Sequence, residues 1–182
     1  MTPPKVFLDA NVLYPGLVRG ILLCVAKAGL LRPHWSQRVL DEWQISIARK
    51  QGPDAEMGVI AARQAMAATF PDAMLSLDPA LEESIHLPDR ADAHVAAAAN
   101  GTDILLTFNL RDFPRRRVQQ LGYQVSHPDS FLWHLLSTQP EATGAAIERA
   151  LLDADVDLGD ARQALKRAQL PRVAKLWVAD HQ

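Results

Sequence analysis

The sequence predicts an α/β protein, with a parallel sheet flanked by helices and a helical extension at the C-terminus. Segments with helical periodicity alternate with short strands along the chain, and these strands are apolar throughout instead of alternating between apolar and polar residues. Uninterrupted apolar runs are expected where both faces of a strand are buried, as in parallel sheets. Ligands of such sheets bind beyond the carboxyl ends of the strands, so polar residues at those ends are candidates for function.

The clearest strands are predicted at residues 6–8, 103–108 and 123–126, and residues 70–77 contain a short extended segment. Ser36 has the residue type and position of a helix N-cap, and Gly29 suits a helix C-terminus. Helices with one apolar face are expected over residues 17–28, 37–50, 54–69 and 88–100, and from Asp129 or Ser130 onward.

We interpret residues 1–138 as the α/β domain and residues 139–182 as a helical C-terminal extension. From Pro140 onward the pattern is helical and more polar, with a break near residues 157–160 and a further proline at position 171. Neither an internal repeat nor a low-complexity tract interrupts this organisation.

Composition excludes several classes of protein. With 48% hydrophobic and 22% charged residues among 182, the chain is able to bury a core and is not expected to be disordered. Its 19 Lys and Arg against 21 Asp and Glu argue against a protein that coats nucleic acid, although a local basic patch is compatible with this balance. A single cysteine, Cys24, excludes an internal disulfide. No apolar run approaches the roughly 20 residues of a membrane span, so a cytoplasmic protein is expected.

Four acidic residues are candidates for a site at the sheet edge. Asp9 directly follows the first apolar strand, where an unpaired buried carboxylate would cost several kcal/mol. Asp92 lies in the first turn of a helix that leads into the strand at 103–108, and Asp112 follows that strand. Glu42 lies at the edge of an apolar helical stripe. Each has an ordinary alternative role, respectively as a helix cap, a first-turn residue, a loop acid and a solvated helix residue.

Convergence of these acids would require protons or a divalent cation. Two carboxylates about 4 Å apart repel by about 4 kcal/mol at an effective dielectric constant of about 20, a large part of a domain's stability. Oxygen ligands without cysteine or paired histidines favour Mg²⁺ or Mn²⁺ over zinc. The segment "LRDFPRRR" adds arginines beside the predicted site, and guanidinium groups match phosphate geometry well.

The segments "VFLDANVL", "VLDEW", "PDRADAHVAAAA" and "ILLTFNLRDFP" resemble, in order and spacing, the four acidic motifs of PIN-domain ribonucleases. The likeness covers roughly residues 5–136 and is greatest to the bacterial VapC-type toxins. It implies a PIN-like, Rossmann-like parallel sheet and Mg²⁺- or Mn²⁺-dependent cleavage of RNA. It also implies a cognate antitoxin protein as partner, and a homodimer is common in the family.

The resemblance assigns roles to individual residues. Asp9, Glu42, Asp92 and Asp112 would be catalytic. Asp9, Asp92 and Asp112 would hold the metal ion, and Glu42 would either bind it directly or orient water. Asn109 stands where many PIN enzymes have an aspartate, so either Asn109 or Asp112 completes the set. The residues expected on the substrate side are Asn11, Thr107, Asn109, Arg111, Arg115 and Arg116, of which Asn11 and Thr107 would act by positioning Asp9 and the fourth motif.

Two other readings stay open. A PIN-like module that has lost catalysis and binds RNA or a protein is favoured by Asn109 and opposed by the other acids. A phosphotransferase with Asp9 as nucleophile usually needs a second acid two residues further on, where this chain has Asn11. His94, two residues after Asp92, is expected on another helix face and not as a metal ligand.

Overall fold

The sheet of this protein is five-stranded and entirely parallel, with the strand order β3-β2-β1-β4-β5. A computed structural model describes residues 2–179. The strands are β1 (Lys5–Leu8), β2 (Arg32–Ser36), β3 (Met74–Leu75), β4 (Ile104–Leu106) and β5 (Gln124–Ser126). In the central register, Phe7 of β1 lies opposite His34 of β2 and Leu105 of β4. The predicted α/β class is therefore confirmed.

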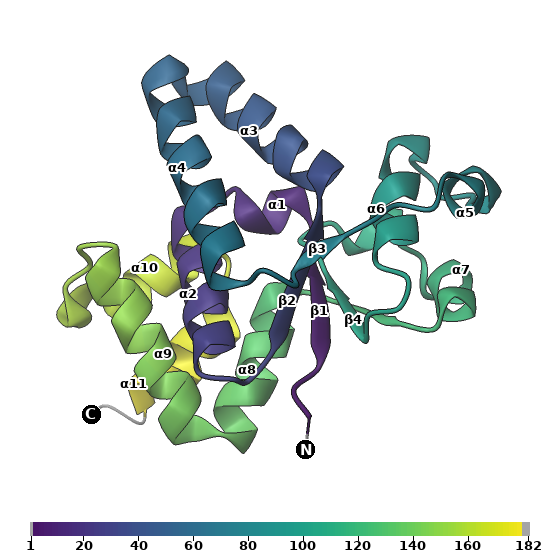
Figure 1. The fold of residues 1–182 in the computed structure, drawn as a ribbon. Helices are drawn as coiled ribbons and strands as arrows, with labels where there is room; N and C mark the ends of the chain where they lie inside the picture. The colour runs from purple at the N-terminus through teal and green to yellow at the C-terminus, as the bar shows by residue number, and fades with distance from the viewer. Residues whose placement is uncertain (1, 180–182) are drawn as a thin grey trace.

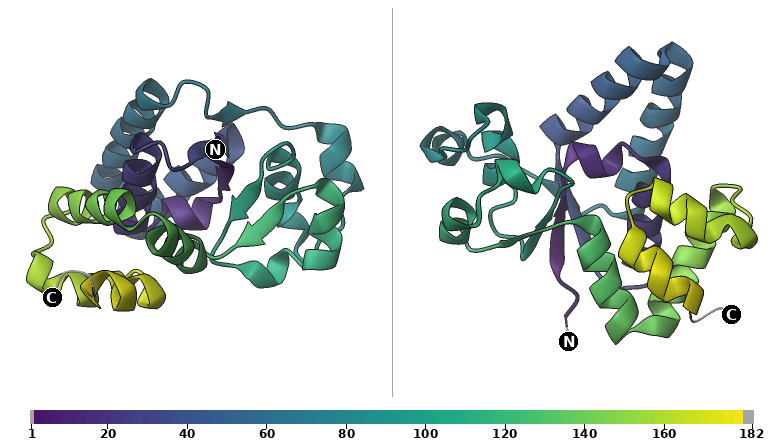
Figure 2. Two further views of the ribbon diagram at one scale, coloured as in Figure 1. Left: turned by 90° about the horizontal axis from the view of Figure 1, so that it is seen from below. Right: turned by 180° about the vertical axis from the view of Figure 1, so that it is seen from behind.

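Helices cover both faces of the sheet. Figures 1 and 2 show α2, α8, α9, α10 and α11 gathered on one side and α5, α6 and α7 on the other, while α3 and α4 form a hairpin that projects past the carboxyl end of β1. The α-helices are α1 (Ala10–Leu13), α2 (Gly16–Lys27), α3 (Gln37–Gln51), α4 (Pro53–Thr69), α5 (Pro79–Ser84), α6 (Ala93–Ala98), α7 (Arg115–Val118), α8 (Pro128–Thr138), α9 (Pro140–Asp153), α10 (Ala161–Arg167) and α11 (Pro171–Ala179). Short 3-10 turns are η1 (Arg90–Asp92), η2 (Leu110–Asp112), η3 (Gln119–Leu121) and η4 (Leu158–Asp160).

Local sequence signals set several of these boundaries. The Ser36 hydroxyl accepts a hydrogen bond from the Val39 N–H at 3.3 Å and so caps α3, as predicted. Gly29 follows α2 with φ +74°, a conformation that glycine adopts without steric cost. Helix α8 begins at Pro128, before the predicted start at Asp129 or Ser130. Its N-cap is His127, whose Nδ1 accepts from the Asp129 N–H.

The C-terminal extension shares the core of the α/β domain. Ile147 and Leu151 of α9 are fully buried and belong to the same apolar cluster as Phe7 and Leu105 of the sheet. Each fully buried side chain of this size contributes about 1.5–3 kcal/mol of hydrophobic stabilisation. The predicted boundary at residue 138 coincides with the end of α8, and the division into two domains stays a prediction.

A buried carboxylate ties the last helix to the rest of the protein. The Asp129 side chain is only 4% exposed, and its oxygens accept hydrogen bonds from the backbone N–H groups of Arg172 (3.0 and 3.2 Å) and Val173 (3.1 Å). These N–H groups belong to the first turn of α11, which has no intrahelical acceptors for them. Asp129 therefore caps α11 across a tertiary contact, with its negative charge at the positive end of the helix.

We expect Asp129→Ala to lower the free energy of unfolding by about 2–3 kcal/mol, because two N–H groups lose a charged acceptor in a buried place. Urea denaturation measures this change. The matched control is Asp157→Ala, which removes an exposed cap on the Gly159 N–H and should cost about 1 kcal/mol or less. Equal losses in the two variants would contradict the role given to Asp129.

No helix within residues 2–179 combines the length and the hydropathy that a membrane span requires.

Candidate active site

The candidate site lies where the strand order reverses. The chain leaves β1 for β2 and β3 on one side, and then returns to form β4 on the other side of β1. Side chains that follow β1 and β4 therefore meet at the carboxyl edge of the sheet, the usual place for ligands in open parallel sheets. Asp9 follows β1 and Thr107 follows β4.

A hydrogen-bond network holds the Asp9 carboxylate at this edge. Its Oδ2 accepts from Asn11 Nδ2 at 2.6 Å and from the Thr107 hydroxyl at 2.7 Å, and Asn11 Nδ2 also donates to Thr107 Oγ1 at 2.9 Å. The backbone is tied in as well, because Phe108 N–H donates to Asn11 Oδ1 and Asn109 N–H to Thr107 Oγ1. Although Asp9 occupies the N-cap position of α1, its side chain makes no capping hydrogen bond to that helix. Its orientation is set by β4 and the loop after it.

Burial makes the charged form of Asp9 costly. The side chain is 5% exposed, and this desolvation raises the pKa of Asp9 above its ordinary value. The Thr107 hydroxyl and the backbone of Ala10 act in the opposite direction, while the negative charge of Glu42 raises the pKa further and His94 lowers it. Among residues 2–179, no Lys or Arg forms a salt bridge with Asp9.

Asp92 is placed beside Asp9 by a short turn at the start of α6. Asp89 Oδ1 accepts a hydrogen bond from Ala91 N–H at 2.8 Å and so caps η1, the role that the sequence predicted for it. Asp92 ends η1 and precedes Ala93, the first residue of α6, and its own side chain makes no capping hydrogen bond. This carboxylate is therefore available to the sheet edge.

The pKa of Asp92 is raised to about 6. The largest cause is desolvation, followed by the negative charges of Asp9, Asp112 and Asp89, while His94 acts in the opposite direction. The charges on Asp9 and Asp112 act on Asp92, so these three predicted acids share one electrostatic site. A cation placed among them would reverse this effect and favour the ionised carboxylates.

Glu42 reaches the site from α3 through a contact that the sequence did not predict. Its Oε1 lies 2.9 Å from Nε2 of His94 and 3.5 Å from Nε of Arg38. The His94 side chain is 2% exposed and comes from the first turn of α6, directly after Asp92. The expectation that His94 is not a metal ligand stays a prediction, and its contact with Glu42 of α3 is an addition from the structure. The periodicity of α6 alone carries no information about α3, so no signal in the sequence revealed this contact.

The fourth motif forms a compact turn in η2. Asn109 Nδ2 donates a hydrogen bond to Oδ2 of Asp112. Asn109 and Asp112 are therefore hydrogen-bonded to each other. The negative charge of Asp112 is one of the charges that raise the pKa of Asp92. Which of them meets a metal ion stays a prediction.

We expect Asp112→Asn to lower the pKa of Asp92, because one of the negative charges that raise it is removed. The decrease should be smaller than that caused by Asp9→Asn, since Asp9 is the larger contributor. Carboxyl ¹³C NMR titration of metal-free protein measures both shifts. The control is Asp41→Asn, whose carboxylate pairs with Arg63 at 2.9 Å on the other side of α3 and should leave the Asp92 titration unchanged.

The predicted arginines lie in exposed positions on η2 and α7. Arg111 shares its turn with Asp112, and Arg115 and Arg116 begin α7. Arg117 is engaged elsewhere, since its Nη1 donates to the carbonyl oxygen of His86. The structure thus places a basic segment after β4, and its contact with a substrate stays a prediction.

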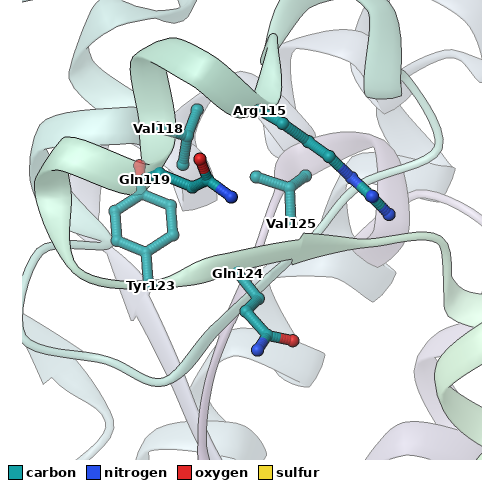
Figure 3. A pocket seen from close by; sticks show the side chains of 6 residues that line it. All are labelled: Arg115, Val118, Gln119, Tyr123, Gln124 and Val125. Carbon is teal, nitrogen blue, oxygen red and sulfur yellow. The ribbon is translucent and has the colours of Figure 1, made fainter.

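Arg115 also borders a cavity of about 250 Å³ at the edge strand β5. Figure 3 shows Val125 rising from β5 between the Gln119 amide and the Arg115 side chain, whereas Gln124 points to the other side of the strand. The residues that line this cavity are Arg115, Val118, Gln119, Tyr123, Gln124 and Val125. None of the four acids is among them, so this cavity is separate from the carboxylate site.

The donor set fits a hard divalent cation that keeps much of its water. Within residues 2–179, no group of three or more His, Cys, Asp or Glu side chains forms a complete metal cluster. Mg²⁺ is often bound by only one or two carboxylates, with water and substrate phosphates as its other ligands. Asp9 and Asp92, two mutually repelling carboxylates at an open sheet edge, have this chemistry.

The site combines a parallel α/β sheet with acidic residues at its switch point. A family model of the PIN domain matches residues 5–111, more than half of the chain, and the matched range contains Asp9, Glu42 and Asp92. This chain belongs to the PIN-domain family, whose members are generally nucleases, and the predicted resemblance is confirmed at this level. No curated protein and no solved structure gives a significant match to the chain.

Proposed function

We propose that this PIN-domain protein is a divalent-metal-dependent endoribonuclease. The observation that carries the proposal is the juxtaposition of Asp9 and Asp92 at the β1–β4 edge. Each has a raised pKa, and no Lys or Arg in the described part of the chain forms a salt bridge with either. An arrangement this unfavourable for a metal-free protein is expected where the site is built for a cation.

Each residue of the network has a part in the proposed reaction. Asp9 and Asp92 would bind the ion, and Thr107 and Asn11 hold the Asp9 carboxylate in one orientation through the hydrogen bonds described above. Glu42 would orient the attacking water. A bound divalent ion supplies a more acidic water and stabilises the charge that develops on the phosphate.

The basic segment after β4 supports a polyanionic substrate. Arg111, Arg115 and Arg116 are exposed within a few residues of Asp112, where they would contact phosphates on either side of the cleaved bond. Such contacts are independent of base sequence, so the choice of RNA would depend on the shape of the surrounding loops.

The direct test is cleavage of an internally labelled, end-blocked RNA by the purified protein with Mg²⁺, with Mn²⁺ and with EDTA. We expect internal cleavage with either ion, none with EDTA, and recovery when the ion is restored. A DNA of the same sequence serves as a control that tests whether cleavage requires the ribose of RNA. If calorimetry detects no divalent ion on the protein even with RNA present, the proposal is wrong. Ion-independent RNA binding without cleavage would instead favour the binding-module alternative.

We further propose that this nuclease is the toxin of a toxin–antitoxin pair, inhibited by a small cognate antitoxin and able to form a homodimer. The support is the resemblance of the four acidic motifs to VapC-type toxins, in their order and spacing. Induced expression in a bacterial host should arrest growth, and the Asp9→Asn variant expressed to the same level should not. Growth arrest by both proteins would contradict a nuclease toxin.

A further inference from the structure

The contact between His94 and Glu42 connects the second acid to the helix that follows Asp92. His94 is the one polar side chain of α6, whose other residues are alanines and a valine, and all six residues of this helix are buried. Its Nε2 lies 2.9 Å from Oε1 of Glu42, while Nδ1 has no hydrogen-bond partner among residues 2–179. Burial of a polar ring is unfavourable unless its polar atoms are paired. The contact with Glu42 is thus the polar interaction that compensates for a histidine at this position.

Arg38 is the other basic side chain in contact with Glu42, and it is less able to fix the carboxylate. Its side chain is 49% exposed, its Nε lies 3.5 Å from Glu42 Oε1, and its Nη1 is engaged by Glu82 at 2.9 Å. An exposed ion pair between two flexible side chains contributes little and leaves both mobile. The imidazole of His94 is held by its surroundings and has few rotamers, so it imposes a direction on the longer Glu42 side chain.

We propose that His94 is a positioning residue that holds the Glu42 carboxylate toward Asp9. The inference rests on the proposed nuclease function. It explains how a glutamate with a side chain 40% exposed on a surface helix acts on the buried Asp9: one of its oxygens is anchored to α6, which begins immediately after Asp92. Groups that support a reactive carboxylate in this way determine whether a site is ordered enough to function.

Kinetics of three variants and a double-mutant cycle test the role. We expect His94→Leu to lower kcat about 10- to 100-fold with KM changed less than about 3-fold, because Glu42 loses its anchor and the phosphate contacts remain. His94→Gln should recover most of this loss, since its amide N–H reaches close to the position of Nε2. In a Glu42→Gln background, His94→Leu should cause no further loss. Equal losses in both backgrounds, or no recovery by His94→Gln, would overturn the proposal. Arg38→Gln is the matched control and should change kcat less than about 3-fold.

A readout on the metal-free protein keeps the inference separate from the nuclease activity. The Nε2–H proton of His94, assigned by its loss in His94→Gln, should be protected from solvent exchange because the ring is buried and hydrogen-bonded. Glu42→Gln should shift this NMR signal and speed its exchange, whereas Arg38→Gln should not. If the signal does not respond to Glu42→Gln, the positioning role is wrong regardless of activity. A responding signal in a wild-type protein that cleaves no RNA would refute the nuclease function and leave the His94–Glu42 contact established.

Discussion

Replacing Asp9 by asparagine should reduce metal-dependent RNA cleavage by about 10³-fold or more while the protein stays folded. Asparagine has nearly the same shape and keeps an oxygen to accept the hydrogen bonds from Thr107 and Asn11. What it lacks is the negative charge that would bind the cation, and a 10³-fold loss corresponds to about 4 kcal/mol of transition-state stabilisation. Mg²⁺ and Mn²⁺ binding measured by calorimetry should disappear together with cleavage.

The control for Asp9→Asn lies at the opposite, amino edge of the sheet, directly before β4. Asp103 Oδ2 accepts a hydrogen bond from the Lys5 N–H at the amino edge of the sheet. Asp103→Asn therefore removes a carboxylate of the same type next to β1 without touching the carboxyl edge, and it should leave cleavage unchanged. A folded Asp9→Asn protein that retains full metal-dependent cleavage would contradict the proposed site.

Replacing Asp92 by asparagine should abolish cleavage to a similar extent and, in addition, stabilise the metal-free protein at neutral pH. The folded-state pKa of Asp92 is about 6, above its ordinary value of 3.8, because its charged form is disfavoured by burial and by neighbouring carboxylates. Asparagine is uncharged, so this unfavourable contribution is absent from the variant. After allowance for solvent screening, we expect the free energy of unfolding to rise by about 1 kcal/mol at pH 7. This corresponds to an increase of about 2–4 °C in Tm.

The direction of the Asp92 pKa shift determines the pH range over which the stability changes. A carboxyl with a raised folded-state pKa binds a proton more tightly in the folded than in the unfolded protein, so its contribution to stability is complete below about pH 4. It is lost as the pH rises through about 6. The stability difference between Asp92→Asn and wild type should therefore be small at pH 4, grow between pH 4 and 6, and level off above.

Thermal melts of both proteins across pH 4–8 in EDTA measure this difference. Desolvation lowers the pKa values of the buried His34 and the half-buried His127, which also change stability in this range. Both histidines are common to the two proteins, so their effects cancel in the difference. Saturating Mg²⁺ should reverse the order of stability, because only the wild type keeps both carboxylates for the ion. A difference that grows toward acid pH would refute the raised pKa of Asp92.

Much of the fold follows from short-range patterns in the sequence. The apolar residues 6–8 and the Ser36 cap each act within a few residues, and the structure has the predicted strand and cap there. The apolar run at 103–108 was predicted longer than β4, which ends at Leu106. The Thr107 N–H still donates to the Ser126 carbonyl oxygen of β5, and its hydroxyl donates to Asp9.

Strand β2 was missed because its residues are poor strand formers when considered alone. The segment "RPHWS" begins with Arg32, whose N–H bonds to Pro4 at the start of the sheet, whereas the N–H of Trp35 points the other way, to Ala73 before β3. Pro33, which has no N–H, faces the β3 side, and β3 pairs only from Trp35 onward. The missing donor therefore costs no sheet hydrogen bond, but this is visible only when the neighbouring strands are in place.

The sequence by itself determined that Asp9 ends a buried strand and that four acidic motifs occur in the order of a PIN domain, because strand periodicity and motif spacing are properties of the linear chain. Only the tertiary structure decided which groups meet Asp9 and Glu42. Thr107 reaches Asp9 because β1 and β4 are paired, and His94 reaches Glu42 because α6 packs near α3. Contacts between residues far apart in the chain depend on how the elements pack, and no local pattern encodes that packing.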